Sequence, residues 1–503
     1  MRVAAPITCL LAGGNAVVHA FSSVQHRAQP NGSVSANCEK ACAELSTAFG
    51  LALHYPDSDN FTIWDAKQQE VRPACRIEPS NASQVSQVLD ILVNHWCHFA
   101  VKGGGHSRNP GDSNSVGGVT VDLDRMTQVK ILDESRARVG GGANTLQVYK
   151  ALDSHNLSFV GGRVGTVGVG GFTLGGGTSP FTSKYGWALD NVYEYEVVLA
   201  NSTITTANET HNADLYFALR GGGNNFGIVT AFTVRTFTQG FVSTTMTTYS
   251  RNQTAKVLDQ VYELSTDETL TSDPDMSYDS FYTYSSADDS FILSGTQRYA
   301  KPVRNPAVFD EINRIPTLTR STTISNMSSL THDPEPLGVT RHLFGTLTVA
   351  PSRSLLARAV TIFEQEVQAI KSVECMVANF ITYAVPRTAI AAMKQRGGNA
   401  LGIHGDQPLF LILISTAWSD ASGDTAVNTM TENTIQRVKE AAASLGVANP
   451  FLYINYASAA QAPEVFAGYG EKNVQRLQEI QRAVDPRGVF TSQGLWTGFV
   501  KLI

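Results

Sequence analysis

The chain has 503 residues, a formal net charge of −6 and 42% hydrophobic residues. This length corresponds to about three domain-sized units and is enough to bury a substantial core. The basic residues are scattered rather than clustered, so neither nucleic acid nor an anionic membrane surface is an expected partner. No segment after the N-terminus has the length of a transmembrane helix.

The N-terminus is typical of a secretory signal. Over residues 1–20, Arg2 is followed by an apolar stretch and then by the small-residue cleavage pattern Val-His-Ala. Many Asn-X-Ser/Thr sequons follow, as expected for a glycosylated product. They begin at Asn31, Asn60, Asn81, Asn156, Asn201, Asn208, Asn252 and Asn326. The protein is therefore predicted to be secreted or to lie in the lumen of the secretory pathway.

Cysteine usage agrees with an oxidising compartment. Of the six cysteines, one lies in the predicted signal, and Cys38, Cys42, Cys75 and Cys97 cluster near the mature N-terminus. Cys38 and Cys42 share a predicted helix face, so each is expected to pair with Cys75 or Cys97, in either combination. Cys375 is left over and is expected to be a buried, unreactive thiol.

The first predicted elements lead into a glycine loop. Helical spacing covers 38–49 and 79–92, and a short strand at Phe99–Val101 precedes the segment VKGGGHS, which contains His106. Helix, strand and glycine loop in this order are typical of a mononucleotide-binding unit. The GxGxxG pattern of a Rossmann fold is not found at the required place.

Glycine recurs in two further segments of the first half. The three segments cover 101–107, 161–177 and 220–230. Apolar, β-branched runs at 118–123, 192–199 and 228–234 predict strands between and after them. Glycine lets the backbone approach a ligand and exposes N–H groups that can hold an anion such as pyrophosphate. The pattern therefore indicates a long, extended ligand, with His106 beside it.

The composition changes after Gln239. Glycine clusters stop, and alternating Thr, Ser and Tyr residues predict antiparallel strands with one polar face. These strands are expected at 244–250, 276–286 and 291–300, and another strand-like run covers 409–417. Helices are expected at 306–312, 353–370, 427–445 and 473–484.

The ordered motifs resemble those of a known family. VKGGGHS, GVTVDLDRM, GGRVGTVGVGGFTLGGG and RGGGNNFGIVTAFTV, followed near the C-terminus by FLYINYA and DPRGVFTSQ, resemble the berberine-bridge-enzyme-like FAD-linked oxidases of the vanillyl-alcohol-oxidase-type superfamily. The resemblance covers the chain from about Val71 to the end. It implies an α+β fold: a two-part FAD-binding domain of the PCMH type with an inserted antiparallel-sheet substrate domain. The implied divisions are a lead-in and helix at 21–70, FAD-binding at 71–239, substrate-binding at 240–450 and a returning segment at 451–503.

The resemblance implies an FAD cofactor bonded through a single residue. His106 matches the family histidine that is bonded to the 8α-methyl group of FAD. Val164 stands where a second, cysteinyl link would form, and Phe172 replaces a histidine that helps carry negative charge on the flavin in relatives. The cofactor is therefore expected to be monocovalent. The residues expected to contact it are Gly103, Gly104, Gly105, His106, Ser107, Val164, Gly165, Thr166, Gly168, Gly171, Phe172, Gly176, Ile228 and Val229.

A tyrosine pair near the C-terminus is the candidate for the catalytic base. As a strand, 451–457 would place Tyr453 on one face and Tyr456 on the other. The resemblance implies that Tyr456 deprotonates the substrate, with Tyr453 in support. Because a phenol is a poor base near neutral pH, it would need a positive or hydrogen-bonding neighbour. The alternative is that Tyr456 is structural. No metal site is expected, since His95, Cys97 and His98 lack the separated ligand pairs of zinc sites.

The resemblance implies an oxidase that transfers hydride from a small alcohol or amine of secondary metabolism to FAD, and electrons to O2, giving H2O2. Its partners would be that substrate and O2, and a monomer is expected. An alternative is a mono- or oligosaccharide oxidase, with aromatic platforms supplied by Tyr282, Tyr284, Phe291 and Tyr299. An alternative of another class is a flavin-bearing cyclase with no net redox change. A further alternative is a binding or structural relative of these enzymes that has lost its cofactor. The purified protein would then be colourless, because it would contain no flavin.

Overall fold

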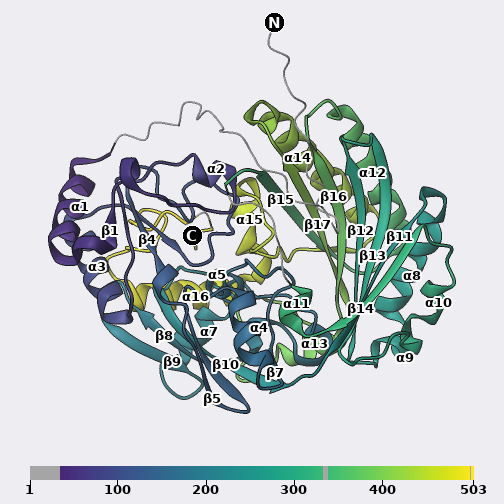
Figure 1. Cartoon of the computed structure of the whole chain (residues 1–503), viewed down its shortest axis with the longest axis horizontal. Coiled ribbons are helices and arrows are strands. Elements are labelled where there is room, and N and C mark those ends of the chain that lie inside the picture. The colour runs from purple at the N-terminus through teal and green to yellow at the C-terminus, as the bar shows by residue number, and fades with distance from the viewer. Residues whose placement is uncertain (1–33, 332–337, 499, 503) are drawn as a thin grey trace, which may run out of the picture.

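The computed structural model describes residues 34–331, 338–498 and 500–502. The predicted signal over 1–20 and the sequon at Asn31 lie outside these ranges. Three sheets organise the described chain, and Figure 1 shows the third, with its helices, beside the lobe that contains the other two. The predicted α+β class, with a large antiparallel sheet, is confirmed. Within the described ranges no helix is long and apolar enough to cross a membrane.

The first sheet has four strands in the order β1–β2–β4–β3, of which β2, β4 and β3 are parallel. In that order their bounds are Leu53–His54, Cys75–Ile77, Val119–Asp122 and Phe99–Lys102. Helices α1 (Ala36–Phe49) and α3 (Ala82–His95) share a hydrophobic core with it. Asn81 caps α3 by accepting a hydrogen bond from the Gln84 N–H, which fixes where this helix begins.

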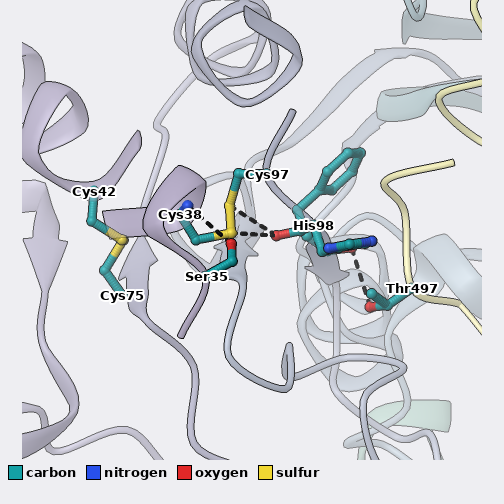
Figure 2. The surroundings of a disulfide bond; sticks show 8 residues. Ser35, Cys38, Cys42, Cys75, Cys97, His98 and Thr497 are labelled. Carbon is teal, nitrogen blue, oxygen red and sulfur yellow. Dashed lines mark hydrogen bonds between the residues drawn. A yellow bond between two sulfur atoms is a disulfide. The ribbon is translucent and has the colours of Figure 1, made fainter. Parts of the chain in front are cut away.

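Two disulfides attach α1 to the first sheet (Figure 2). Cys38 is bonded to Cys97, which lies just before β3, and Cys42 is bonded to Cys75, the first residue of β2. Because Cys38 and Cys42 are about one helical turn apart, both sulfur atoms face the sheet. The expectation that each pairs with one of the two later cysteines is confirmed.

The second sheet is antiparallel, with the order β5–β6–β10–β8–β9 and with β7 paired to the end of β10. The bounds are β5 Val129–Asp133, β6 Arg136–Gly140, β7 Leu157–Phe159, β8 Val192–Val198, β9 Ile204–Asn208 and β10 Ile228–Thr238. Helices α4 (Thr145–Asp153) and α7 (Ala213–Leu219) lie against its outer strands. Strand β10 is central and buried along most of its length, which explains its apolar sequence.

The third sheet has eight antiparallel strands in the order β14–β11–β13–β12–β16–β17–β15–β18. The bounds are β11 Val242–Tyr249, β12 Met276–Ser285, β13 Ser290–Tyr299, β14 Thr319–Ser325, β15 Arg341–Val349, β16 Val377–Val385, β17 Leu409–Trp418 and β18 Ala448–Asn449. Helices α8 (Thr254–Thr266), α12 (Arg353–Ala369) and α14 (Asp424–Ser444) pack on one face (Figure 1). In β17, Ile412 faces these helices and Leu413 faces the other lobe, so the strand is apolar on both sides.

The remaining helices are short, apart from the last. They are α2 Ala66–Gln69, α5 Val169–Leu174, α6 Thr182–Tyr185, α9 Glu268–Thr271, α10 Asp310–Asn313, α11 Met327–Leu330, α13 Arg387–Ala392, α15 Ala462–Val465 and α16 Glu471–Val484. After β18 the chain returns to the first sheet, where Trp496 forms a parallel bridge with Phe99. The C-terminal segment therefore belongs to the lobe of the first two sheets.

Two local predictions are wrong. Cys375 is disulfide-bonded and only partly buried, not a buried free thiol, because it lies in the turn between α12 and β16 and not inside a packed element. Phe451–Ala457 is not a strand: residues 454–456 form a turn in which the Tyr456 N–H donates to the Tyr453 carbonyl at 2.8 Å, and no described strand pairs with the segment.

Candidate active site

A cavity of about 390 Å³ lies where the glycine segments of the first lobe meet the third sheet. Its sheet wall consists of the strand residues Phe344, Ile381, Tyr383, Leu413 and Ser415. The opposite wall is mainly glycine backbone from the loop after β3, from the segment around α5 and from the start of β10. These segments are far apart in the sequence, so the cavity exists only in the folded chain.

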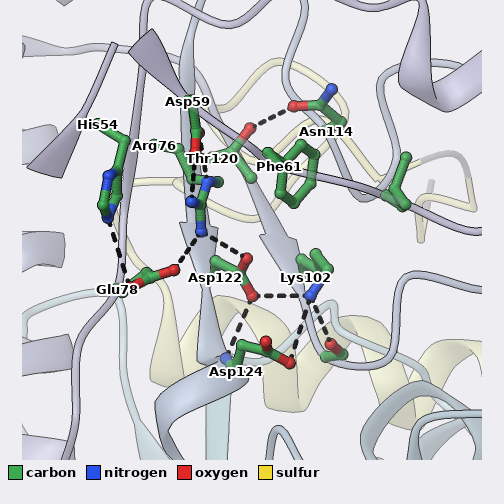
Figure 3. Close-up of polar contacts among 12 residues, drawn as sticks. His54, Asp59, Phe61, Arg76, Glu78, Lys102, Asn114, Thr120, Asp122 and Asp124 are labelled. Atoms are coloured by element: carbon green, nitrogen blue, oxygen red, sulfur yellow. Dashed lines mark hydrogen bonds and ion pairs between the residues drawn. The ribbon is translucent and has the colours of Figure 1, made fainter. Parts of the chain in front are cut away.

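A buried ion network anchors the loop after β3 (Figure 3). Lys102, the last residue of β3, places its Nζ 2.9 Å from Asp122 Oδ1 on β4. The second oxygen of Asp122 is 3.0 Å from Arg76 Nη1 on β2. Since removing one partner of a buried pair leaves an uncompensated charge, these contacts fix the three strand ends relative to one another. The loop Gly103–Ser107 therefore leaves the sheet from a defined position.

The loop Gly103–Ser107 presents unused hydrogen-bond donors. Within the described part of the chain, none of its amide groups donates a hydrogen bond to another protein group. Gly105 has a φ of +70°, in the left-handed region that favours glycine. Successive N–H groups of this kind form an anion-binding concavity. The loop is thus suited to a phosphate-bearing ligand.

The imidazole of His106 faces this cavity and is held on two sides. Its Nε2 is 2.9 Å from Thr166 Oγ1, and its ring stacks on Trp64 with the centroids 4.3 Å apart. Burial, together with the positive charges of Arg108 and His342, holds the pKa of His106 well below its usual range. The imidazole is therefore neutral at physiological pH, and its Nδ1 is the nitrogen that Thr166 leaves free.

Most of the residues predicted to contact the cofactor line this cavity. They are Gly103, Gly104, Gly105, His106, Ser107, Val164, Gly168, Gly171, Phe172, Ile228 and Val229. The other three predicted residues lie behind it. Thr166 supports His106, Gly165 donates its N–H to the carbonyl of Thr331, and Gly176 packs against the ring of Tyr453.

Val164 and Phe172, which the family resemblance marks as substituted positions, both line the cavity. Val164 is 37% exposed, so its side chain is accessible from the cavity. The carbonyl of Phe172 accepts a hydrogen bond from Asn455 Nδ2 at 3.0 Å. The described lining of the cavity contains no cysteine, and no described cysteine is free.

The turn at 453–456 gives its two tyrosines different surroundings. The hydroxyl of Tyr453 accepts hydrogen bonds from the Gly177 N–H and from Asn455 Nδ2, both at 2.9 Å, and burial raises the pKa of Tyr453 well above its ordinary value. Tyr456 packs edge-on against Tyr453, with ring centroids 4.6 Å apart, and lies 5.9 Å from the ring of Tyr383. Tyr453 is thus committed to structure, whereas Tyr456 lines the cavity beside the third sheet.

Two arginines on the cavity wall were not predicted from the sequence. Arg163 Nε is 3.0 Å from Asp279 Oδ2 on β12, and its guanidinium lies 4.7 Å from the ring centre of Tyr383. Arg108 places its guanidinium 3.6 Å from the ring centre of Phe344 and donates from Nη1 to the Asn455 carbonyl at 3.0 Å. Both arginines carry positive charge to the cavity wall.

A signal for these arginines was present in the motifs themselves. Arg108 is two residues after His106, and Arg163 directly precedes Val164. Arginines in glycine loops are usually solvated, so position alone did not separate them from surface residues. Trp64 carried no such signal, because its approach to His106 depends on the folding of a distant segment.

Comparisons with known proteins agree with this geometry. A family model described as an FAD-binding domain matches residues 73–208. The chain is 34% identical over 490 residues to the FAD-dependent monooxygenase tpcD of Cochliobolus heterostrophus, covering 91% of this chain and 93% of that relative. Among solved structures, it is similar to a glucooligosaccharide oxidase of Acremonium strictum (TM-score 0.73, 22% identity, 94% of this chain and 100% of that chain). It is also similar to berberine bridge enzyme (TM-score 0.74, 17% identity, 91% of this chain and 99% of that chain).

Because the solved structures are only 17% and 22% identical to this chain, they establish its fold alone. The family membership is established by tpcD, which is 34% identical over 91% of this chain. The first two glycine segments, including the His106 loop, lie within the FAD-binding match at 73–208. The chain therefore belongs to the berberine-bridge-enzyme-like FAD-linked oxidoreductases, the enzyme family that its motifs resemble.

Proposed function

We propose that this enzyme is an oxidase in which FAD is bonded to His106 alone. It removes a hydride from a small organic alcohol or amine of secondary metabolism and passes the electrons to O2, giving H2O2. The observation that carries the proposal is the placement of His106, which faces the cavity while Thr166 engages its Nε2 at 2.9 Å. Val164 supports a single link, because it faces the cavity at the position where relatives would have the second attachment residue.

The protein atoms fit this cofactor. The unused amides of Gly103–Ser107 provide donors for a pyrophosphate. A Cβ at Gly168 would lie 2.2 Å from the Gly104 nitrogen, so the close approach of the two loops admits only glycine there. A Cβ at Gly171 would meet no protein atom within 4 Å, so its backbone is open to the cavity. These residues, with Ile228 at the start of β10, would hold the cofactor.

The neighbours of His106 prepare it as a nucleophile. We assign the proton to Nε2, which would donate it to the Thr166 hydroxyl, so that the lone pair of Nδ1 is directed away from that contact. Stacking on Trp64 restricts rotation of the ring, and the lowered pKa of His106 keeps the imidazole uncharged. A neutral, oriented imidazole is what formation of a carbon–nitrogen bond requires.

Bound FAD would supply the hydride acceptor, and Tyr456 would supply the base. The side chain of Tyr456 lines the same cavity as the two arginines, Arg108 and Arg163, so its hydroxyl is placed where it could contact a bound substrate. Tyr453 is unsuited to this role, because two donors already occupy its oxygen.

The cavity wall favours a compact, largely apolar substrate over a sugar. Phe344, Ile381 and Leu413 present hydrocarbon from the third sheet. The aromatic residues that a sugar groove would use face elsewhere: Tyr282 and Tyr284 belong to the core beneath the helices, and Phe291 packs against it. A saccharide substrate would therefore lack the aromatic platforms expected from the sequence.

Secretion and glycosylation form part of the same proposal. Two disulfides near the mature N-terminus are stable in an oxidising compartment. The sequon residues Asn60, Asn81 and Asn156 are exposed and so accessible to modification. Treatment of the secreted protein with a glycan-removing enzyme should increase its gel mobility.

The first experiment is a visible spectrum of purified protein before and after acid precipitation, for the wild type and for His106→Ala. Yellow colour that stays in the wild-type pellet, but enters the supernatant for His106→Ala, is the expected result. Colour in the wild-type supernatant would overturn the covalent link, and a colourless protein would overturn the oxidase. A substrate screen that follows H2O2 release and incorporation of labelled oxygen then distinguishes an oxidase from a monooxygenase.

A further inference from the structure

Among the described residues, no carboxylate lies within ion-pair distance of Arg108 on the cavity wall, although Asp65 and Asp112 lie near enough to interact with its charge. Of its donors, Nη1 is used by the Asn455 carbonyl at 3.0 Å. Its Nε is buried without a hydrogen-bond partner among the described residues, and Nη2 donates to none of them either. Burial lowers the pKa of Arg108 to about 10, so the group is still charged at physiological pH.

Of the two described arginines that line the cavity, only Arg108 has no carboxylate bound to it; Arg220, buried elsewhere in this lobe, also has none but does not line the cavity. Arg163, on the same cavity, is bound to Asp279. Arg76 and Lys102 both bind Asp122. A buried charge without a partner destabilises the fold, so such a group is usually retained where a ligand completes the pair.

The free edge of Arg108 has a defined direction. The Phe344 ring lies 3.6 Å from the guanidinium carbon, and the Asn455 carbonyl fixes Nη1 from another side. The Nε and Nη2 donors are thereby left without protein acceptors on one edge of the guanidinium, and Nε is enclosed by protein. This pair of parallel N–H groups matches the two oxygens of a carboxylate once neighbouring side chains move aside from Nε. The apolar residues Ile381 and Leu413 on the same cavity would accept the hydrocarbon part of such a molecule.

We propose that Arg108 binds a carboxylate group of the substrate, so that the enzyme acts on small organic acids that carry an oxidisable alcohol or amine. This inference rests on the proposed function and adds the chemical class of the substrate. Arg108 is then a specificity-determining residue: it orients the acid by two parallel hydrogen bonds, while the reacting carbon lies toward Tyr456.

The test is a titration of the yellow holoenzyme with benzoate and with benzamide, its uncharged counterpart of the same shape, followed by the visible flavin spectrum. Wild type should bind benzoate more tightly than benzamide. Arg108→Gln should weaken benzoate binding by about 10- to 100-fold, because charge-assisted bonds are lost, and change benzamide binding by less than about threefold. Arg108→Lys should fall between, because it keeps the charge but loses the paired donors.

Arg163→Gln is the matched control. It also removes one guanidinium from the cavity wall, but one already bound by protein groups, its Nε by Asp279 and its Nη1 by the carbonyl and hydroxyl of Thr178. If direct pairing explains benzoate binding, Arg163→Gln changes it by less than about threefold. An equal loss in both glutamine variants would mean that only the general positive field matters, and would overturn the inference.

Three other results would also overturn the inference that Arg108 binds a carboxylate. The wild type could bind benzoate and benzamide equally, or its flavin spectrum could show no response to benzoate. The third is an Arg108→Gln variant that binds benzoate as tightly as the wild type. Loss of flavin from both Arg108 variants would assign the guanidinium to the cofactor instead. If Arg108→Gln does not fold, Arg108→Lys decides by the same comparison. Colourless wild-type protein would be a failure of the proposed function, seen before any titration.

Discussion

The backbones of Gly104 and Gly168 touch, although the two residues belong to different glycine segments. A Cβ on Gly168 would fall 2.2 Å from the Gly104 nitrogen, and a Cβ on Gly104 would fall 2.2 Å from the Gly168 nitrogen. Because both neighbours are backbone atoms, neither can move aside as a flexible side chain could. This contact brings the His106 loop against the segment that leads into α5, and so forms one wall of the cavity.

Gly168→Ala should therefore destabilise the protein by about 3 kcal/mol or more and reduce the bound flavin. Its φ is −66°, which alanine adopts readily, so the effect is steric rather than conformational. Thermal unfolding and the flavin-to-protein absorbance ratio measure the two effects. Gly240→Ala is the control, since nothing lies within 4 Å of its Cβ position. Equal stability of the two variants would contradict the steric explanation.

Thr166→Val should slow covalent attachment of flavin about tenfold, because it removes the hydrogen bond to His106 Nε2 while keeping a similar volume. Thr166→Ser keeps the hydroxyl and should behave like wild type. The measurement is the acid-precipitable flavin formed over time after FAD is added to apoprotein. Attachment at the wild-type rate in the valine variant would show that Thr166 does not orient the imidazole.

Replacement of the two tyrosines by phenylalanine should separate support from catalysis. Tyr453→Phe leaves the buried Gly177 N–H without an acceptor, and is expected to lower the free energy of unfolding by about 2 to 4 kcal/mol. Tyr456→Phe should keep the wild-type melting temperature and flavin content, but lower turnover of a substrate found in the H2O2 screen by at least about 100-fold. Full turnover in Tyr456→Phe would exclude it as the base.

Asp190 predicts a specific pH dependence of stability. It is buried next to the turn that precedes β8, and burial raises its pKa from 3.8 to about 6. Between these values the folded state binds a proton that the unfolded state has lost, so the free energy of unfolding decreases as pH rises from about 4 to 6. The shift corresponds to about 3 kcal/mol, lost fully above the folded pKa.

The asparagine in Asp190→Asn cannot ionise. The melting temperature of this variant should therefore increase relative to that of the wild type as the pH rises through this window. The constant difference caused by altered hydrogen bonds to the Trp187 N–H and Asn399 does not change with pH and can be subtracted. Parallel melting curves of the two proteins between pH 4 and 7 would show that Asp190 ionises normally in the fold.

Several elements could be predicted from the sequence because local chemistry specifies them. The Asn81 cap and the apolar spacing after it fix α3, and the continuous apolar, β-branched runs of β10 and β17 fix strands. The same spacing principle brought Cys38 and Cys42 to one side of α1. Each of these depends on residues within one or two turns of each other, where sequence distance and spatial distance agree.

The segment 451–457 shows where this reasoning ends. Its alternation is compatible with a strand, but a strand needs a partner, and partners are supplied by the fold. Here Tyr453 is fixed by donors from Gly177, about 280 positions away, and the chain closes into a turn instead. Tertiary contacts thus overrode a local preference that is weak in so short a segment.

The sequence by itself determined the family, the glycine backbone segments and the identity of His106, since these are properties of contiguous motifs. Only the tertiary structure decided which side chains share the cavity: Trp64 stacked on His106, Arg163 paired with Asp279, and Arg108 left with a free edge. The physical reason is that pairing, burial and desolvation depend on what lies within a few ångströms. That neighbourhood is assembled from three sheets whose residues are widely separated along the chain.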